Sequence, residues 1–541
     1  MTETEPMPDA EPDARASFPG AETVPGDLLD AFLAYERAIL ANDLDALDAF
    51  FAPGDGTMRG DDAGLLVGHD AISAFRSLRG GVGPRVIERV EHRPLSDDAA
   101  LLVSVSRFAA GGRGLQTQVW TRSAAGWRIM AAHVSPRPKA FDRAIWRTVG
   151  DPLFQGAWEG PLEGLTVAVK DLFAIKGYRI GAGNPAYLES VPPETRTAAA
   201  VSDLLRGGAS LRGIARTDEF AYSVAGDNAH YGTPPNGAVP GALPGGSSSG
   251  PASAVATGQA DIGLATDTAG SIRVPASYQG LWGLRTTHGL VPRQGLLPLA
   301  QSFDTVGWLA RDGGTLQRVA EWCLSYDGSA STENVYGESD SELPRRLVVP
   351  REAMDVVESH TRVAFEALLD RLGLAFETVS IGDLGDYHDA FRAVQGAEAW
   401  RNNGEWLTAH PDATGGGVAQ RFRDAAAITA EQERAARDRL APLKERIDAV
   451  VADAVLILPT VPGPAPMRTA DRARVDAVRT ATLRMTTPVA VAGVPAISAP
   501  LLTVAARSGP APVGVCLASR AGTDIALVRL ARELASVLEN A

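Results

Sequence analysis

The sequence predicts an α/β protein in which a small α+β domain precedes a larger domain built on a mixed central sheet flanked by helices. Three observations support this prediction. The chain has 541 residues, which is long for one domain and sufficient for two. Near the N-terminus, segments with helical periodicity are followed by several alternating strands. Beyond residue 150, apolar β-like runs alternate with long helical stretches, which is typical of a largely buried sheet.

The composition excludes several classes of protein. Hydrophobic residues make up 45% of the chain and charged residues 21%, an ordinary globular mixture, and the formal net charge is −14. Because an acidic protein repels phosphate backbones and anionic lipids, we expect no nucleic-acid or membrane partner and a cytoplasmic location. No apolar run is long enough to span a bilayer.

Cysteine usage argues against disulfides and metal centres. The chain has two cysteines, Cys323 and Cys516, and neither has cysteine or histidine neighbours at metal-ligand spacing. We therefore expect no metal and no cofactor.

Residues 1–26 are acidic and rich in proline. They lack the basic and apolar regions of a signal peptide, so we expect a disordered tail.

Residues 27–137 carry the pattern of the first domain. The segment DLLDAFLAYERAILANDLDALDAFFA has apolar residues near helical spacing, and GHDAISAFRSLR predicts a second helix that begins at Asp70. Four runs with strand-like alternation follow: PRVIERVEHRPL, AALLVSVSRFAA, GLQTQVWTRSA and GWRIMAAHVSP. This order resembles the NTF2-like (SnoaL-like) cone, and GHDAISAF and GWRIMAAHVS resemble its AtzH-like branch.

Such cones bind small molecules or catalyse with Asp and His, and the candidates here are Asp43, His69, Asp70, His92 and His133. Structural roles are the favoured alternative, with His133 as an ordinary strand residue and His69-Asp70 at a helix cap. We expect this domain to assist assembly or to cover the mouth of an active site.

Residues 138–158 are expected to form a linker, and residues 159–541 the larger domain. Within the larger domain, residues 240–277 combine many glycines and serines with apolar runs. A phosphate cradle needs a lysine directly before its Ser or Thr, and GGSSSG has none. Residues 246–250 match the G-x-S-x-G nucleophile elbow, but no strand precedes them. Four histidines follow in the chain, none of them in a recognisable motif: His288, His360, His388 and His410.

A third interpretation of residues 240–277 is that Ser271 is a nucleophile and that the side-chain amine of Lys170, distant in sequence, is its base. Ser271 follows the apolar run ADIGLA and the small residues Ala269 and Gly270, where backbone N–H groups can converge on one oxygen. Lys170 ends the apolar run LTVAVK, and taken alone it is better explained as a surface residue. Burial lowers a lysine pKa by up to ~3–5 units, which would make it a usable base.

These segments together resemble the amidase signature family. GLTVAVKDLF, PGGSSSG and GLATDTAGSIRVPAS occur in the family's order, with 77 residues from Lys170 to Ser247 and 24 from Ser247 to Ser271. EFAYSVAGDNAHYGTPPN, GAEAWRNNGEW and LILPTVPGPAP resemble the branch that contains plant indole-acetamide hydrolase and the amidase-like domain of a chloroplast import receptor.

The resemblance implies a Ser–cis-Ser–Lys triad, with Ser271 as nucleophile, Ser247 as the bridging serine after a cis peptide, and Lys170 as base. It also implies an oxyanion hole and an acyl pocket. The oxyanion hole would use the N–H groups of Thr268, Ala269, Gly270 and Ser271. The acyl pocket would lie near Ala221, Tyr222, Trp400 and Met485. Asp267 and Arg273 are expected to brace the loop. The sequence departs from the family pattern at Ala269, Ser249 and Pro251.

The resulting prediction is an amidohydrolase, active as a homodimer on a small-molecule amide. The substrate stays open between an aryl-acetamide and a carboxylated urea such as carboxybiuret, whose carboxylate Arg273 or another arginine would bind. A non-catalytic amidase-like scaffold and a serine esterase are the alternatives.

Overall fold

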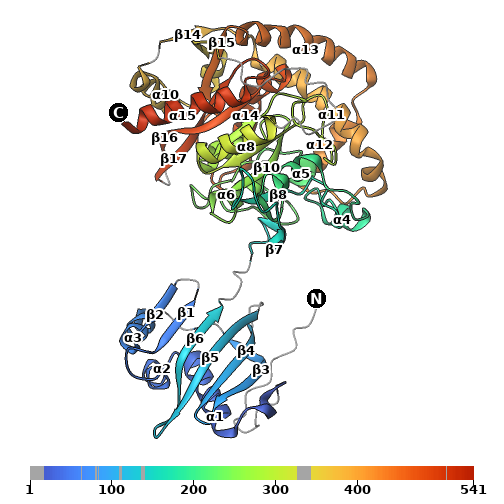
Figure 1. Cartoon of the computed structure of the whole chain (residues 1–541). Helices are drawn as coiled ribbons and strands as arrows, with labels where there is room; N and C mark the ends of the chain where they lie inside the picture. Colours follow the sequence, from blue (N-terminus) through green and yellow to red (C-terminus); the bar gives the residue numbers. More distant parts are fainter. Residues whose placement is uncertain are drawn as a thin grey trace. The chain divides into compact units, whose positions relative to one another are not determined.

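The computed structural model describes residues 18–61, 64–78, 82, 84–108, 113–135, 141–325, 343–373, 375–506 and 509–540. The chain divides into two compact units, residues 1–141 and 142–541 (Figure 1). Each unit has an apolar core of its own, as domains do.

The N-terminal unit is α+β, as predicted. Its strands form one sheet in the order β2-β1-β6-β5-β4-β3, which is antiparallel except where β1 pairs with β6. Leu28, Phe32 and Tyr35 of α1 are buried in one cluster with Trp120 of β5. The elements are α1 (Gly26–Ala41), α2 (Leu44–Phe50), β1 (Met58–Asp61), β2 (Gly64–Val67), α3 (His69–Leu78), β3 (Arg85–Ser96), β4 (Ala99–Phe108), β5 (Arg113–Ser123) and β6 (Gly126–Ser135).

Ordered structure begins before the expected domain start at residue 27. A short 3-10 helix, η1 (Ala21–Thr23), precedes α1, and Ala21 and Val24 are buried. The N–H group of Val90 donates to the carbonyl oxygen of Pro19, which ties this segment to the sheet. Residues 1–17 of the expected tail lie outside the described residues.

The C-terminal unit has a mixed sheet with helices on its faces (Figure 1), as predicted. The described strands follow the order β14-β13-β15-β17-β16-β11-β12-β10-β8-β9-β7. They are β7 (Trp146–Phe154), β8 (Thr166–Lys170), β9 (Ser210–Ala215), β10 (Ile262–Asp267), β11 (Trp282–Arg285), β12 (Thr305–Ala310), β13 (Arg346–Pro350), β14 (Phe376–Val379), β15 (Ala454–Pro459), β16 (Ala496–Ala506) and β17 (Gly509–Ala518).

Helices connect these strands. Most strands of the sheet's centre are buried along their whole length, which is why they read as continuous apolar runs. The described helices are α4 (Pro185–Ser190), α5 (Ala199–Arg206), η2 (Glu219–Ala221), α6 (Ser249–Ala256), α7 (Arg273–Gln279), α8 (Gly313–Ser325), α9 (Arg351–Val356), α10 (Ser359–Leu372), α11 (Leu384–Ala409), α12 (Gly416–Ala426), α13 (Ala430–Val451), α14 (Arg472–Ala492) and α15 (Asp524–Asn540).

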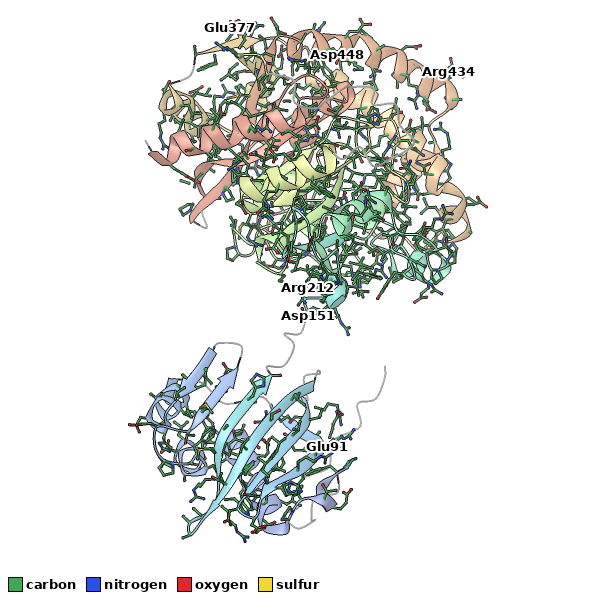
Figure 2. All side chains as sticks on the ribbon, viewed as in Figure 1. Glu91, Asp151, Arg212, Glu377, Arg434 and Asp448 are labelled. Atoms are coloured by element: carbon green, nitrogen blue, oxygen red, sulfur yellow. The ribbon has the colours of Figure 1, made fainter. Side chains whose placement is uncertain are left out.

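Part of the expected linker belongs to the large sheet. Strand β7 pairs with β9, and the guanidinium of Arg212 on β9 binds Asp151 and the carbonyl oxygen of Gly150 at 2.7 Å each (Figure 2). The Trp146 side chain is buried and anchors the start of β7. Residues 146–154 are therefore part of the sheet, and their interpretation as a linker was wrong. The strand was missed because its apolar and polar residues alternate only weakly. Residues 136–140 lie outside the described residues.

The sheet topology brings the two segments that end in Lys170 and Asp267 to one edge of the sheet. Strands β8 and β10 are parallel neighbours, with Val169 opposite Leu264. Because parallel strands end at the same edge, Lys170 and Asp267 at their carboxyl ends lie near each other. The loops that follow β8 and β10 build the candidate site.

Candidate active site

Lys170 is fully buried at the end of β8. Its Nζ lies 2.8 Å from Ser247 Oγ, 2.9 Å from Ser248 Oγ and 2.8 Å from Thr266 Oγ1. Burial lowers the pKa of Lys170 to about 7, although nearby carboxylates, that of Asp218 foremost, oppose the shift. The amine therefore exists as a mixture of neutral and charged forms near neutral pH.

The direction of these hydrogen bonds restricts where a neutral amine accepts a proton. The Ser248 hydroxyl donates to the carbonyl oxygen of Thr266 at 3.2 Å, so its oxygen accepts from Lys170. A neutral amine has two N–H donors and one lone pair. The lone pair is consequently left for the hydroxyl of Ser247 or that of Thr266.

The peptide bond between Gly246 and Ser247 is cis, as the family resemblance implies. The chain is held there from two sides. The Ser247 carbonyl oxygen accepts from Thr217 Oγ1 at 2.8 Å and from the Asp218 N–H group at 3.1 Å. Position 246 has no room for a larger residue, since an added Cβ would lie 2.2 Å from Asp218 Oδ2.

Asp218 is buried behind this loop. Its carboxylate accepts from Ser249 Oγ at 2.9 Å and from the Gly226 N–H group at 3.0 Å. Burial raises the pKa of Asp218 to about 6. The third serine of the tract therefore serves to hold Asp218, and only Ser247 and Ser248 reach Lys170.

Ser271 lies between β10 and α7 and is 3% exposed, facing a pocket. Its carbonyl oxygen accepts from the Ser248 N–H group at 3.3 Å, which ties the two serine segments together. Among the hydrogen bonds of the described residues, none joins the Ser247 and Ser271 hydroxyls. The structure thus brings Lys170 and Ser247 into direct contact and Ser271 to the neighbouring wall of the pocket.

The loop before Ser271 does not offer all of the expected oxyanion donors. The N–H group of Gly270 already donates to Asp267 Oδ1 at 2.8 Å. The N–H groups of Thr268, Ala269 and Ser271 are the candidates that remain. Gly270 has a φ of 134°, a conformation that favours glycine, and this turns the loop toward the pocket.

Asp267 braces the loop, as expected. Its carboxylate accepts from the Ile272 N–H group and from the guanidinium groups of Arg273 and Arg285, at 2.9 to 3.2 Å. Although burial raises the pKa of Asp267, the two arginine charges outweigh it and hold that pKa well below its usual range. Arg273 also donates to the Thr486 carbonyl oxygen and is 1% exposed. Of the expected partners for a substrate carboxylate, Arg273 or another arginine, Arg273 is thus already bonded within the protein.

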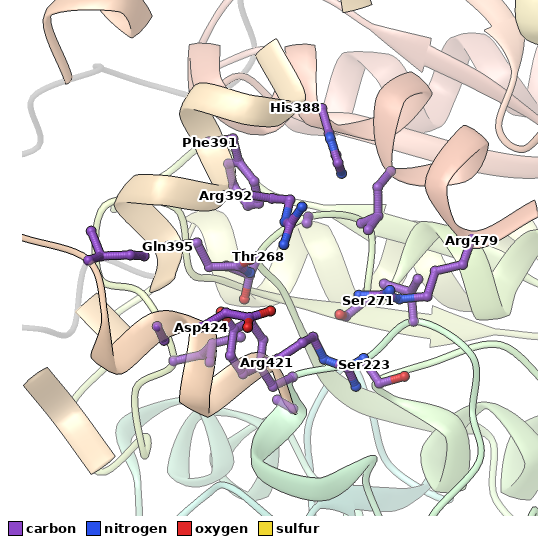
Figure 3. A pocket seen from close by; sticks show the side chains of 18 residues that line it. Ser223, Thr268, Ser271, His388, Phe391, Arg392, Gln395, Arg421, Asp424 and Arg479 are labelled. Atoms are coloured by element: carbon purple, nitrogen blue, oxygen red, sulfur yellow. The ribbon is translucent and has the colours of Figure 1, made fainter. Parts of the chain in front are cut away.

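A pocket lies beside Ser271 (Figure 3). Ala221 and Tyr222, the residues expected near the acyl pocket, line it together with Thr268 and Ala269. Trp400 and Met485 do not line it, because both pack into apolar clusters instead. Their apolar character fitted either place, so sequence alone did not separate them.

The sequence did not predict the charged side chains that the C-terminal helices contribute to the pocket. The pocket is lined by Arg392 of α11, Arg421 and Asp424 of α12, and Arg479 of α14. These four residues lie on helices whose exposed faces carry many charges, and no local motif distinguishes them. Of the four downstream histidines, only His388 lines the pocket, and burial lowers its pKa.

Of the Asp and His candidates of the N-terminal unit, only the chain neighbours His69 and Asp70 form a pair among the described ion pairs, at 3.9 Å. Asp43 caps α2 through the Ala46 N–H group, His69 contacts the Asp48 carbonyl oxygen, and His92 contacts that of Thr23. Asp70 and His133 are exposed. The favoured structural roles agree with these positions.

The sequence reasoning also missed a buried polar group in this unit. Glu36 accepts three hydrogen bonds from the Arg85 guanidinium and one from Gln116. The signal that could have found it is a lone glutamate on the apolar face of α1.

Across the part of the chain that the structure describes, no helix is long and apolar enough to cross a membrane. The same residues contain no group of three or more His, Cys, Asp or Glu side chains arranged to hold a metal ion.

Comparison with known proteins agrees with this architecture. The family model described as Amidase matches residues 150–528, and the model described as AtzH-like matches residues 21–139. Amidase 1 of Arabidopsis thaliana is 33% identical over 412 residues, covering 70% of this chain and 94% of that protein.

Two solved structures resemble the chain at a TM-score of 0.63. One is an inhibitor-bound vestigial protein complex, described as revealing the evolutionary origins of an s-triazine catabolic enzyme. It is 29% identical and covers 70% of this chain and 84% of that chain. The other is a variant of Kluyveromyces lactis allophanate hydrolase, 25% identical, covering 70% of this chain and 62% of that chain.

The chain belongs to the amidase signature family and carries an AtzH-like domain at its N-terminus. It is accordingly an amidohydrolase, a hydrolase of carbon–nitrogen bonds other than peptide bonds.

Proposed function

We propose that the protein cleaves the C–N bond of a small carboxamide to an acid plus ammonia or an amine. Ser271 is the nucleophile, Ser247 relays protons, and Lys170 is the base. The observation that carries the proposal is the contact between Ser247 Oγ and the Nζ of a fully buried lysine. A base whose pKa is about 7 accepts a proton readily at neutral pH.

The acylation step follows from this contact. Neutral Lys170 takes the proton of Ser247, Ser247 takes the proton of Ser271, and the Ser271 oxygen forms a bond to the amide carbon. The π electron pair moves onto the carbonyl oxygen, where backbone N–H groups of Thr268, Ala269 and Ser271 stabilise it. This step requires the Ser271 hydroxyl to turn toward Ser247.

The remaining steps return the enzyme to its starting state. When the tetrahedral intermediate collapses, the C–N bond breaks and the nitrogen takes the proton from Lys170 by way of Ser247. Water then attacks the acyl-enzyme through the same relay and releases the acid.

Neither alternative explains the site as well. A non-catalytic scaffold has no need of a buried lysine in contact with serine hydroxyls, which is unfavourable unless it has a use. An esterase of the Ser-His-Asp type needs a histidine on its nucleophile. Among the hydrogen bonds of the described residues, none joins a histidine ring to the Ser271 hydroxyl, and this includes His388, which lines the same pocket.

The test is ammonia release from a panel of small amides by the full chain and by Ser271→Ala, Ser247→Ala and Lys170→Met. We expect each variant to lose at least about 10³-fold in kcat. Because the three groups act in one relay, the double variant Ser247→Ala/Lys170→Met should be hardly worse than either single variant. Retained turnover in Ser271→Ala would show that the nucleophile is misassigned.

The assembly state belongs to the same proposal. We propose a homodimer in the cytoplasm, with the AtzH-like domain assisting assembly or covering the active-site mouth. Light scattering of the full chain at several concentrations checks the first part, and a mass equal to one chain at all of them would contradict it.

A further inference from the structure

Three arginines surround the pocket that Ser271 faces. Arg392, Arg421 and Arg479 come from three different helices and project into this pocket (Figure 3). We refer to these three residues as the arginine cluster. Because the three arginines are 29 and 58 positions apart in the chain, the cluster exists only in the folded protein.

Among the described residues, no carboxylate forms an ion pair, at up to 4.0 Å, with a member of the arginine cluster. The Nε atoms of Arg421 and Arg479 are buried and have no hydrogen-bond partner. Arg392 is exposed and Arg421 and Arg479 are half-buried, so these two Nε atoms are the part of the cluster that is removed from water. A buried N–H donor is ordinarily paired, since burying it without a partner is unfavourable.

The surrounding charges leave the pocket positive. Arg421 has one aromatic contact, with the Tyr222 ring at 5.7 Å, which leaves the edge of its guanidinium free. Burial, and after it the charge of Arg479, lowers the pKa of Arg421 to about 10. Asp424 is the one carboxylate among the described lining residues and is exposed, so within the lining three positive charges face one negative charge. Outside the lining, the charges of Asp218 and Asp227 act on Arg421 and oppose the lowering of its pKa.

We propose that the substrate amide carries a carboxylate, which binds to the arginine cluster while the amide carbonyl lies at Ser271. A planar guanidinium donates two parallel hydrogen bonds to a carboxylate, and Arg421 and Arg479 have unused donors for this purpose. This inference rests on the proposed amide hydrolysis and specifies its substrate class. A neutral aryl-acetamide would leave the cluster unpaired.

The first test compares kcat/KM within two matched pairs of substrates, malonamate with malonamide and succinamate with succinamide. Each pair differs only in exchanging a carboxylate for a neutral amide, and indole-3-acetamide is added as the aryl alternative. We expect the better carboxylated amide to exceed its neutral partner by at least about tenfold, the value of one charged hydrogen bond. A neutral amide that is hydrolysed equally well or better overturns the inference.

Variants then attribute the preference to the cluster. Arg421→Gln and Arg479→Gln should each reduce kcat/KM for the carboxylated amide by about 10- to 100-fold and for the neutral partner by less than about threefold. Arg423→Gln is the matched control, because Arg423 is exposed on the same helix and bonds Gln420. Equal losses on both substrates would contradict the assignment. Arg421→Lys keeps the positive charge but loses the two parallel donors of the guanidinium. Its kcat/KM for the carboxylated amide should lie between those of the wild type and Arg421→Gln. This conservative variant provides the test if Arg421→Gln does not fold.

A binding experiment separates this inference from the proposed reaction. Calorimetric titration of Ser271→Ala with malonamate and succinamate measures recognition without turnover, with the corresponding diamides as controls. We expect Ser271→Ala to bind at least one carboxylated amide more tightly than the corresponding diamide. This preference should be lost in the double variant Ser271→Ala/Arg421→Gln. If neither binds more tightly than its diamide, the inference is wrong even where the wild type cleaves neutral amides. If binding is selective but the wild type releases no ammonia, the proposed reaction is wrong and the recognition stands.

Discussion

The pH dependence of turnover tests the role of Lys170 most quantitatively. Burial lowers the pKa of this lysine to about 7, and only its neutral form accepts the proton of Ser247. With a pKa of about 7, roughly a tenth of the amine is neutral at pH 6 and roughly nine tenths at pH 8. Activity should therefore rise about tenfold between these pH values.

The assay is kcat/KM for ammonia release between pH 5.5 and 9, which reports the free enzyme. His388 does not account for the predicted inflection, because its pKa is lowered below the ordinary histidine value. A rate that is constant from pH 6 to pH 8 would refute the reasoning, as would an inflection near the ordinary lysine pKa.

A charge variant tests the same cause independently. The Asp218 carboxylate favours the charged form of Lys170 and thus raises its pKa. Asp218→Asn removes that charge, so the acid limb of the profile should move to lower pH. Movement to higher pH would contradict the electrostatic account.

Three further experiments, which use four substitutions, have definite expected outcomes. Ser247→Ala should lower kcat by about 10³-fold, whereas Ser248→Ala should lower it by about tenfold, because the second variant deletes a hydrogen bond and not the proton relay. Equal losses of kcat in parallel kinetic assays would contradict this distinction. Asp267→Asn should lower the free energy of unfolding by about 3 to 5 kcal/mol, because it leaves two buried guanidinium groups unpaired, and an unchanged thermal midpoint in calorimetry would disprove that. Gly246→Ala should destabilise the protein by about 1 to 3 kcal/mol, because its Cβ would meet the Asp218 carboxylate at 2.2 Å; denaturant unfolding identical to the wild type would count against the close approach.

The sequence was most informative where the site depends on local spacing. Lys170 ends a strand, Ser247 follows a glycine, and Ser271 lies in a small-residue loop before a helix, and all three positions follow from short segments. The parallel pairing of β8 and β10 then brings these segments to one edge of the sheet. Strand periodicity predicts such a sheet in general terms.

The rest depended on tertiary contacts that no short segment encodes. The sequence leaves Arg273 as a candidate for binding a substrate, but in the folded protein its side chain is buried against Asp267. Arg421 and Arg479 lie on helices whose charge pattern is typical of a solvated face, and only packing turns them toward the pocket. Gly270 was counted as an oxyanion donor, but its N–H group is already bonded to Asp267.

The central claim is that Ser271 is the nucleophile and that Lys170 activates it through Ser247. The most direct measurement is labelling of the full chain with a fluorophosphonate, followed by intact-mass and peptide analysis. The account predicts one adduct per chain, located at Ser271, absent in Ser271→Ala and formed much more slowly in Lys170→Met. An adduct on Ser247, or labelling that persists in Ser271→Ala, would contradict it.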